Sequence, residues 1–329
     1  MRSIKLSKNS LLFAFVLFAF LPLSTVHATP APSLVPSRTT GVAPLAVFFD
    51  ATGTTDPTIT SRPFHELDYS WNFGDDDSVT WSNGAQPGVN KKNRATGPVS
   101  AHVFENPGTY TVTLTVSDGT NSATQTTTIT VQDPDSVFSG TNTICISSSG
   151  MPVPGSGGCP SEAMATSTSN FTLSLNTYQG TNKRLLFACG DTFNTVTVGA
   201  KIGAITTAGP GTIGAFPIGC ANKPIIKAGN VGGFGDTIIT LSKNGLTSSS
   251  IWAMDDWRIM DLALTGGDFS NTAYGVASAG FFTRLTVLRT DISDVRRGFM
   301  ISLGTNASGG ATAATVPPWD QIYIVGSTI

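Results

Sequence analysis

The chain has 329 residues, of which 12% are charged, and a formal net charge of −2. Its length suggests about two domains, and its near-neutral charge gives no support to nucleic-acid binding, which needs basic patches. The 40% share of hydrophobic residues is too high for a disordered chain. Because 35 glycines accompany so few charges, strands and turns are favoured over helices. We therefore expect an all-β, multi-domain protein.

The first 28 residues have the layout of a secretory signal peptide. Three basic residues precede an uncharged apolar run at 11–23, and Val26-His27-Ala28 offers small residues for cleavage. A membrane anchor is the alternative, but a spanning helix needs about 20 apolar residues. We predict a signal peptide over residues 1–28, a secreted or cell-surface location, and no membrane span in the mature chain.

Short alternating strands follow a Pro-rich linker at residues 29–36. Residues 110–116 alternate with period two, Asp118-Gly119 is a hairpin signal, and residues 124–131 alternate as the returning strand. Several short strands punctuated by turns predict a small β-sandwich over residues 37–134.

This segment resembles the PKD domain. The resemblance is carried by Trp71-Asn72-Phe73-Gly74-Asp75, then His102-Val103-Phe104, and then residues 107–119. The chain departs from the family at Asn72, where Asp is frequent, and in a longer loop at 81–97. The resemblance implies an immunoglobulin-like sandwich that serves as an extracellular spacer or binding module, often beside enzymes that act on polymers.

Two kinds of candidate binding residue lie in the sandwich segment. Asp75, Asp76 and Asp77 supply oxygen ligands of the kind that calcium takes, and calcium is the one cofactor that the sequence offers. The alternative is that aspartates after a glycine form turns and face solvent. Trp81, in the following loop, is the candidate aromatic contact for a carbohydrate.

The second half of the sequence differs from the first in composition and in the spacing of its predicted strands. Residues 135–183 are rich in Ser and Gly, and we expect an irregular N-terminal cap segment there. From 184 to 329, short apolar strands recur between Gly, Asn, Asp or Pro residues. This repetition favours a solenoid of stacked coils. A second sandwich would need longer, hairpinned strands, and hairpin dipeptides are sparse in this half.

The recurring strands are similar to those of the right-handed parallel β-helix, or pectin-lyase-like, group. The similarity is carried by residues 184–193, 257–266, 285–292 and 298–301. It implies a partial right-handed parallel β-helix over residues 184–329 and a relation to proteins that cleave acidic polysaccharides. Because the chain stops inside the apolar stretch 322–329 and solenoids need caps, we expect the coil stack to be truncated at its C-terminal end.

An enzyme of this group would need charged residues in a defined arrangement. Hydrolysis uses two carboxylates across the sugar bond, and a lyase uses a base such as Arg. The candidate carboxylates are Asp255, Asp256, Asp261 and Asp291, with Asp268 and Asp294 nearby, and the candidate bases are Arg258, Arg296 and Arg297. The alternative is that these charges occupy solvated turns. The three histidines all precede residue 103, so the second half lacks the His motifs of pectin-hydrolysing relatives.

All four cysteines lie in the second half, and an exported chain favours disulfides. We favour nearest-neighbour pairing, Cys145 with Cys159 and Cys189 with Cys220, with free buried thiols as the alternative. The sequence has no CxxC motif to support a zinc site.

Two functions with a ligand or substrate remain open, beside a purely structural surface-layer or adhesin role that has no soluble ligand. The first is a secreted or cell-surface protein with a PKD spacer or binding module and a β-helix that presents a surface to an extracellular polysaccharide or a cell-surface protein. The alternative is a polysaccharide lyase or glycoside hydrolase with its active site partly or wholly beyond residue 329. Convergence of Asp255, Asp256, Asp261 and Asp291 on one outer face would favour the enzyme.

Overall fold

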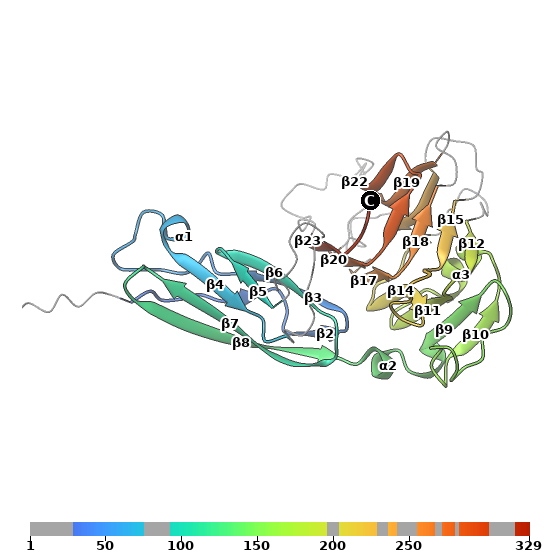
Figure 1. Ribbon diagram of the computed structural model, residues 1–329, viewed down its shortest axis with the longest axis horizontal. Coiled ribbons are helices and arrows are strands. Elements are labelled where there is room, and N and C mark those ends of the chain that lie inside the picture. The colour runs from blue at the N-terminus through green and yellow to red at the C-terminus, as the bar shows by residue number, and fades with distance from the viewer. Residues whose placement is uncertain are drawn as a thin grey trace, which may run out of the picture.

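The computed structural model describes residues 29–75, 93–195, 204–228, 236–241, 255–266, 272–279, 283–302 and 320–329. The signal peptide predicted over 1–28 and the candidate residue Trp81 lie outside these ranges. The described chain is mostly β strand, in a sandwich and a stack of coils connected by the short helix α2 (Pro134–Val137) (Figure 1). None of the helices in these ranges is long and apolar enough to cross a membrane.

The N-terminal body is the β-sandwich that the alternating strands predict. A three-stranded sheet, β1-β3-β6, faces a five-stranded sheet, β2-β8-β7-β4-β5. The elements are β1 (Val35–Pro36), β2 (Thr40–Val42), β3 (Leu45–Asp50), α1 (Pro63–Glu66), β4 (Asp68–Asn72), β5 (Arg94–Thr96), β6 (Val99–Phe104), β7 (Gly108–Ser117) and β8 (Ser122–Gln132). Alternation buries one face of each strand, so that Tyr69 and Trp71 of β4 enter a core shared with Phe49 of β3.

The C-terminal body stacks parallel strands in three sheets. The sheet orders are β10-β9-β11-β14-β17-β20-β23, β12-β15-β18-β21 and β13-β16-β19-β22. From β11 onward, successive strands belong to the first, second and third sheet in turn. Each new strand pairs in parallel with the preceding strand of its own sheet. Inward side chains from all three sheets form one elongated apolar core.

These strands and helices have the following bounds. They are η1 (Gly140–Asn142), β9 (Thr143–Ser147), β10 (Met164–Ser167), α3 (Phe171–Tyr178), β11 (Lys183–Ala188), β12 (Thr192–Asn194), β13 (Ala204–Ile205), β14 (Gly211–Phe216), β15 (Ile225–Lys227), β16 (Asp236–Leu241), β17 (Asp255–Met260), β18 (Ala263–Thr265), β19 (Thr272–Ala279), β20 (Thr283–Leu288), β21 (Asp291–Ser293), β22 (Arg297–Ser302) and β23 (Asp320–Val325).

Two predicted boundaries need correction. The linker at 29–36 belongs to the sandwich, because Ala31 exchanges backbone hydrogen bonds with Thr55 and β1 pairs with β3. The segment 135–183 is not irregular throughout, because β9 pairs with β11 inside the largest sheet. Helix α3 covers the end of the coil core with Phe171 and Leu175. A single short apolar strand between Ser- and Gly-rich flanks gives no periodicity to read, and only its parallel neighbour reveals it.

Candidate functional site at the module junction

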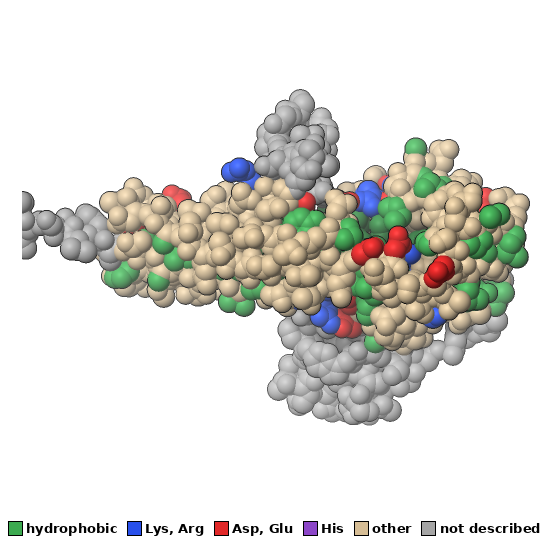
Figure 2. Space-filling model, turned by 90° about the horizontal axis from the view of Figure 1, so that it is seen from below, with side chains coloured by type: hydrophobic (Ala, Val, Ile, Leu, Met, Phe, Trp, Pro, Cys, Tyr) green, Lys and Arg blue, Asp and Glu red, His purple; other side chains and the backbone are tan. Residues whose placement is uncertain are grey.

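The outward side chains of the largest sheet form two rows that run along the coil stack. Since parallel strands in register place equivalent residues side by side, Arg184, Thr212 and Arg258 stand next to one another on β11, β14 and β17. Thr286 and Tyr323 continue this polar row on β20 and β23. All five residues are buried. Charged and apolar side chains gather where the two bodies meet (Figure 2).

Arg258 anchors the sandwich to the coils. Its Nε donates a hydrogen bond to the Pro44 carbonyl (2.8 Å) and its Nη2 donates to the Val42 carbonyl (2.8 Å), both at the turn between β2 and β3. Its side chain is only 1% exposed. A buried guanidinium needs several acceptors to offset its lost hydration, and here the backbone of the other module supplies two of them.

Asp256 extends this anchor to a second arginine. Its Oδ1 lies 2.6 Å from Nη1 of Arg38, in the sandwich, and 3.2 Å from Nη2 of Arg258. Burial by itself would raise the pKa of Asp256, but the charges of Arg258 and Arg38 outweigh burial and hold this pKa below its ordinary value. Asp256 therefore stays ionised, and the network spans both modules.

A second ionic link lies at the opposite end of β17 and β20. Arg289 donates from Nε to Oδ1 of Asp261 (2.6 Å) and also bonds Glu105 of the sandwich. The side chain of Asp261 is 1% exposed. Burial tends to lower the pKa of Arg289, but the two carboxylates raise it above its ordinary value. Beside this link, Tyr323 packs against Ala46 and Val103 of the sandwich.

The two modules leave a cavity of about 270 Å³ between them, which we call the junction cleft. Its floor is an apolar row on the outer face of the largest sheet: Leu186, Gly214, Met260 and Leu288. Gly214 is the position that keeps this row hollow, because an added Cβ would lie 3.1 Å from Cγ of Met260 and 3.7 Å from Cδ2 of Leu186.

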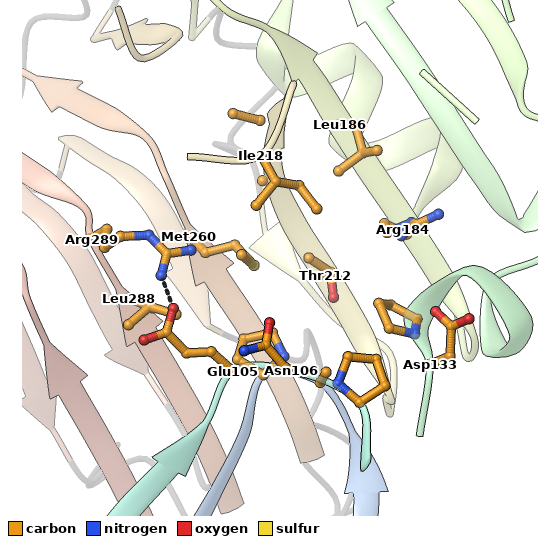
Figure 3. A pocket seen from close by; sticks show the side chains of 16 residues that line it. Glu105, Asn106, Asp133, Arg184, Leu186, Thr212, Ile218, Met260, Leu288 and Arg289 are labelled. Carbon is orange, nitrogen blue, oxygen red and sulfur yellow. Dashed lines mark hydrogen bonds and ion pairs between the residues drawn. The ribbon is translucent and has the colours of Figure 1, made fainter. Parts of the chain in front are cut away.

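Both modules contribute to the walls. Residues of the sandwich and of the segment that follows it supply one side, and Ile218 overhangs the floor from the coils (Figure 3). The lining residues are Ala43, Pro44, Glu105, Asn106, Pro107, Asp133, Pro134, Arg184, Leu186, Thr212, Gly214, Ala215, Ile218, Met260, Leu288 and Arg289.

Charges at the two ends of the cleft are compensated. At one end Glu105 bonds Arg289 (Figure 3). At the other end the side chain of Arg184, 4% exposed, bonds Asp135 at 2.6 Å, and Asp133 also lines the cleft. An apolar floor with a few hydrogen-bonding groups at its rim is the usual composition of a small-molecule site. The cleft thus suits an uncharged ligand that has one apolar face.

The four candidate catalytic aspartates do not share one outer face. Asp255 bonds Arg284 on the next coil, with 2.7 Å between Oδ1 and Nε, and Asp256 and Asp261 belong to the ionic links of the junction. Asp291 lies on β21, in a different sheet, where its Oδ2 is 2.7 Å from Nζ of Lys223. The structure therefore engages all four aspartates with cations.

The remaining candidates for chemistry in the coils are also dispersed. Asp268 lies outside the described residues, and Asp294 accepts hydrogen bonds from Thr265 and Ser293. Of the candidate bases, Arg258 is buried in the junction, whereas Arg297 lies over the ring of Tyr274, 5.9 Å from its centroid. Arg296 is exposed.

Of the three calcium candidates, only Asp75 lies among the described residues, where it pairs with a histidine. Oδ2 of Asp75 lies 2.9 Å from Nε2 of His102, and both side chains are buried. His102 stacks on Phe73 with 4.4 Å between ring centroids. Asp76 and Asp77 lie outside the described ranges. Within these ranges no group of three or more His, Cys, Asp or Glu residues could hold a metal ion.

The cysteines pair as nearest neighbours, Cys145 with Cys159 and Cys189 with Cys220. The first disulfide closes a loop over the outer face of the coils, where Cys145 and Cys159 pack with Leu186 and Phe216. The second fastens the segment that carries Ile218. Both disulfides therefore shape the side of the junction cleft that lies away from the sandwich.

The residues that line the cleft were not among the predicted site residues, although Arg184, and Arg258 beside the cleft, have a distinctive sequence context. Arg184 is followed on β11 by the apolar residues Leu185–Ala188, and Arg258 lies between Trp257 and Ile259 on β17. A lone arginine on the outward face of a buried strand indicates a partner that lies across that face. Which partner lies there depends on how the modules dock.

One comparison with known proteins matches the first module. A family model described as "PKD domain" matches residues 33–131. A solved structure from work on the promiscuous specificity of carbohydrate-binding modules of the β-sandwich superfamily is 26% identical, with a TM-score of 0.24. The match covers 32% of this chain and only 36% of that one. A search of curated proteins finds no match. The resemblance of the N-terminal module to PKD domains is thus confirmed over nearly its whole length.

Proposed function

We propose that this chain is an extracellular binding protein in which a PKD-like sandwich and a right-handed parallel β-helix act as one rigid unit, with a ligand site in the junction cleft. The signal peptide expected at 1–28 and the common use of PKD modules outside cells support export. The rotation of the chain through three parallel sheets supports the β-helix.

The observation that carries this proposal is the shared construction of the cleft. The coils supply the floor, and the sandwich supplies the wall formed by Pro44 and residues 105–107. Neither module encloses the space alone. Since Arg258 and Arg289 fix the sandwich against the coils at both ends of β17 and β20, the cleft is held open as part of the fold.

The ligand class that fits best is an uncharged carbohydrate. A sugar ring has an apolar C–H face, which suits the row of Leu186, Met260 and Leu288. The hydroxyl groups at its edge suit Asn106 and Thr212, which also line the cleft. The arginines that line the cleft already have carboxylate partners. A neutral glycan therefore fits better than the acidic polysaccharide implied by the pectin-lyase-like resemblance.

We assign the aspartates of the coils a structural role instead of a catalytic one. A hydrolase needs one carboxylic acid that can donate a proton and one carboxylate that meets the sugar or a water molecule. Ion pairing with arginine opposes protonation, as the lowered pKa of Asp256 illustrates. Burial of Asp261 also keeps this group away from any polymer on the surface.

Substitution of Gly214 tests this function. We expect the wild-type protein to bind at least one of cellohexaose, mannohexaose and xylohexaose in calorimetric titrations, and trigalacturonate more weakly or not at all. Gly214→Val fills the hollow above the floor and should weaken binding at least tenfold. Gly150→Val is the matched control, because no atom lies within 4 Å of a Cβ at that exposed position. Equal binding by both variants would remove the cleft from consideration.

A further inference from the structure

A second cavity, of about 420 Å³, lies on the sandwich where the short helix α1 leads into β4, at the end remote from the coils (Figure 1). We call it the α1 pocket. Its volume falls in the range of roughly 300–1,000 Å³ that is usual for small-molecule sites. Its described lining residues are Phe64, Leu67, Asp68, Tyr69, Ser70, Thr96, Gly97, Pro98, Thr115 and Ser117. All of them belong to the sandwich, so the coils play no part in this pocket.

Polar side chains from three neighbouring strands face the α1 pocket together. Residues that lie opposite each other in an antiparallel pair project from the same face of the sheet. Ser70 of β4 is the register partner of Thr115 on β7 and of Thr96 on β5. Asp68, two residues before Ser70, is the partner of Ser117. The alternation of β4 turns Asp68 and Ser70 away from the core, so hydroxyl groups and one carboxylate line this side of the pocket.

Phe64 supplies an exposed aromatic ring beside these polar groups. It lies on α1 and is 47% exposed. The helix is fastened to β4, because the backbone N–H of Leu67 (3.0 Å) and the hydroxyl of Tyr69 (3.3 Å) both donate to the Pro63 carbonyl. The ring of His65 lies 4.6 Å from that of Phe64 between centroids. A fixed stretch of backbone therefore presents the Phe64 ring to solvent, outside the core of the sandwich.

Asp68 is the one charged residue in the described lining of the α1 pocket. Its side chain is exposed and, unlike the aspartates of the coils, forms no ion pair within the described ranges. An ionised carboxylate accepts charge-assisted hydrogen bonds from hydroxyl groups, and it repels other anions. The pocket therefore suits an uncharged ligand that is rich in hydroxyl groups and disfavours an acidic one.

We propose that the α1 pocket is a second carbohydrate site, which binds one sugar residue of a neutral glycan. The C–H face of the sugar stacks on Phe64, because C–H hydrogens carry partial positive charge and the face of an aromatic ring is negative. The sugar hydroxyls donate to Asp68 and exchange hydrogen bonds with Ser70. Pro107 lines the junction cleft just before β7, and Ser117 ends β7. At about 3.4 Å per residue, the two sites are therefore about 30 Å apart, and each can bind without the other.

Amide chemical shifts test the proposal, because they report the two sites separately. The probes are cellohexaose, mannohexaose and xylohexaose, titrated into the isotope-labelled full chain. We expect at least one of them to shift the amide signals of residues 65–70 saturably. Gly214→Val, which fills the junction cleft, should leave this response unchanged. Shifts at Met260 and Leu288 report the junction cleft instead, so the proposed function can fail while this second site stands, and the reverse.

Phe64→Ala removes the aromatic ring and should weaken the binding reported by residues 65–70 at least tenfold. Asp68→Asn keeps the shape of the side chain but removes its charge, and should weaken binding several-fold. Both residues are exposed, so circular dichroism should report an intact fold.

The matched control is Phe48→Ala, because Phe48 is exposed to a similar degree (39%) but lies on β3, in the other sheet of the sandwich. It should bind as the wild type does. The proposal is overturned if none of the three probes shifts residues 65–70 saturably, or if Phe64→Ala binds with unchanged affinity. Equally tight binding of trigalacturonate at these residues would overturn it as well, since an acidic sugar should be repelled by Asp68.

Discussion

The sandwich and the coils bury charged side chains in different ways. In the sandwich, Asp75 pairs with His102 inside the same module. The ring of His102 contacts the rings of Phe73 and Phe104. In the coils, the most deeply buried arginine, Arg258, finds its partners in the other module. The sandwich therefore completes its own core, whereas the outer face of the coils depends on the module that covers it.

The coils also pair charges by stacking. Asp256 and Arg284 occupy the same corner of consecutive coils, both with positive φ (56° and 52°), and Asp261 and Arg289 occupy the next corner (58° and 48°). Each pair is 28 residues apart, which is the length of that coil. Opposite charges thus follow one another along each corner of the stack. These charges are neutralised by residues on the neighbouring coil, which are too far away in the sequence to form a local motif.

The largest effect on the dependence of the coils on the sandwich is expected for Arg258→Met. This substitution keeps the apolar stem of the side chain but removes the guanidinium. It takes away the bonds to Val42, Pro44 and Asp256 and should cost about 3–5 kcal/mol, as for other broken buried ion pairs. Urea unfolding measures this loss, and small-angle scattering should show a larger radius of gyration as the sandwich separates. Arg62→Met, whose side chain is 69% exposed, should change stability by less than about 0.5 kcal/mol.

The next largest effect concerns the coils alone. Replacing both Cys145 and Cys159 by Ala opens a loop of 14 residues and should lower the free energy of unfolding by about 3 kcal/mol. Hydrogen exchange should increase around Leu186 and Phe216, which that loop covers, and stay unchanged in the sandwich. Faster exchange in the sandwich core instead would show that the modules share one cooperative unit.

Acid should separate the two modules, because protonation of Asp256 removes its ion pairs with Arg38 and Arg258. The pKa of this residue is lowered in the folded protein from the ordinary 3.8, so its stabilising effect is complete above that value. The effect is lost as the pH falls through the lower, folded pKa. A scattering series from pH 6 to pH 2 should show separation of the modules only below about pH 4. Asp256→Asn should weaken the junction already at neutral pH, and an unaltered acid transition in this variant would contradict the assignment.

The smallest effect is expected for Glu105→Gln. This substitution weakens the half-buried bridge to Arg289, which keeps its bonds to Asp261. A partly exposed pair contributes about 1 kcal/mol or less. Thermal unfolding should therefore change little, while the affinity for a neutral glycan should fall only two- to threefold. A larger loss of affinity at unchanged stability would indicate direct contact between Glu105 and the sugar.

Features that depend on contacts between residues close in the sequence could be predicted, and features that depend on contacts between distant residues could not. The sandwich was predictable because its motifs, such as Trp71 to Asp75, are local and its strands alternate. Short strands between glycines indicated stacking, but β9 escaped because its partner is about 40 residues away. The structural role of Asp256 was not predictable, because its partner Arg38 is 218 residues away in the sequence. Without visible partners, the aspartates of the coils became candidates for catalysis. No local pattern carries such information.

The most direct test of the joint construction of the cleft is a calorimetric titration of the Arg258→Met protein with the neutral hexasaccharide that binds the wild type best. This variant leaves the lining of the cleft unaltered but releases the sandwich from the coils. If the two modules form the site together, binding should fall at least tenfold while circular dichroism still reports folded modules. Undiminished binding by a variant whose modules have separated would show that one module holds the ligand alone, and would contradict this account.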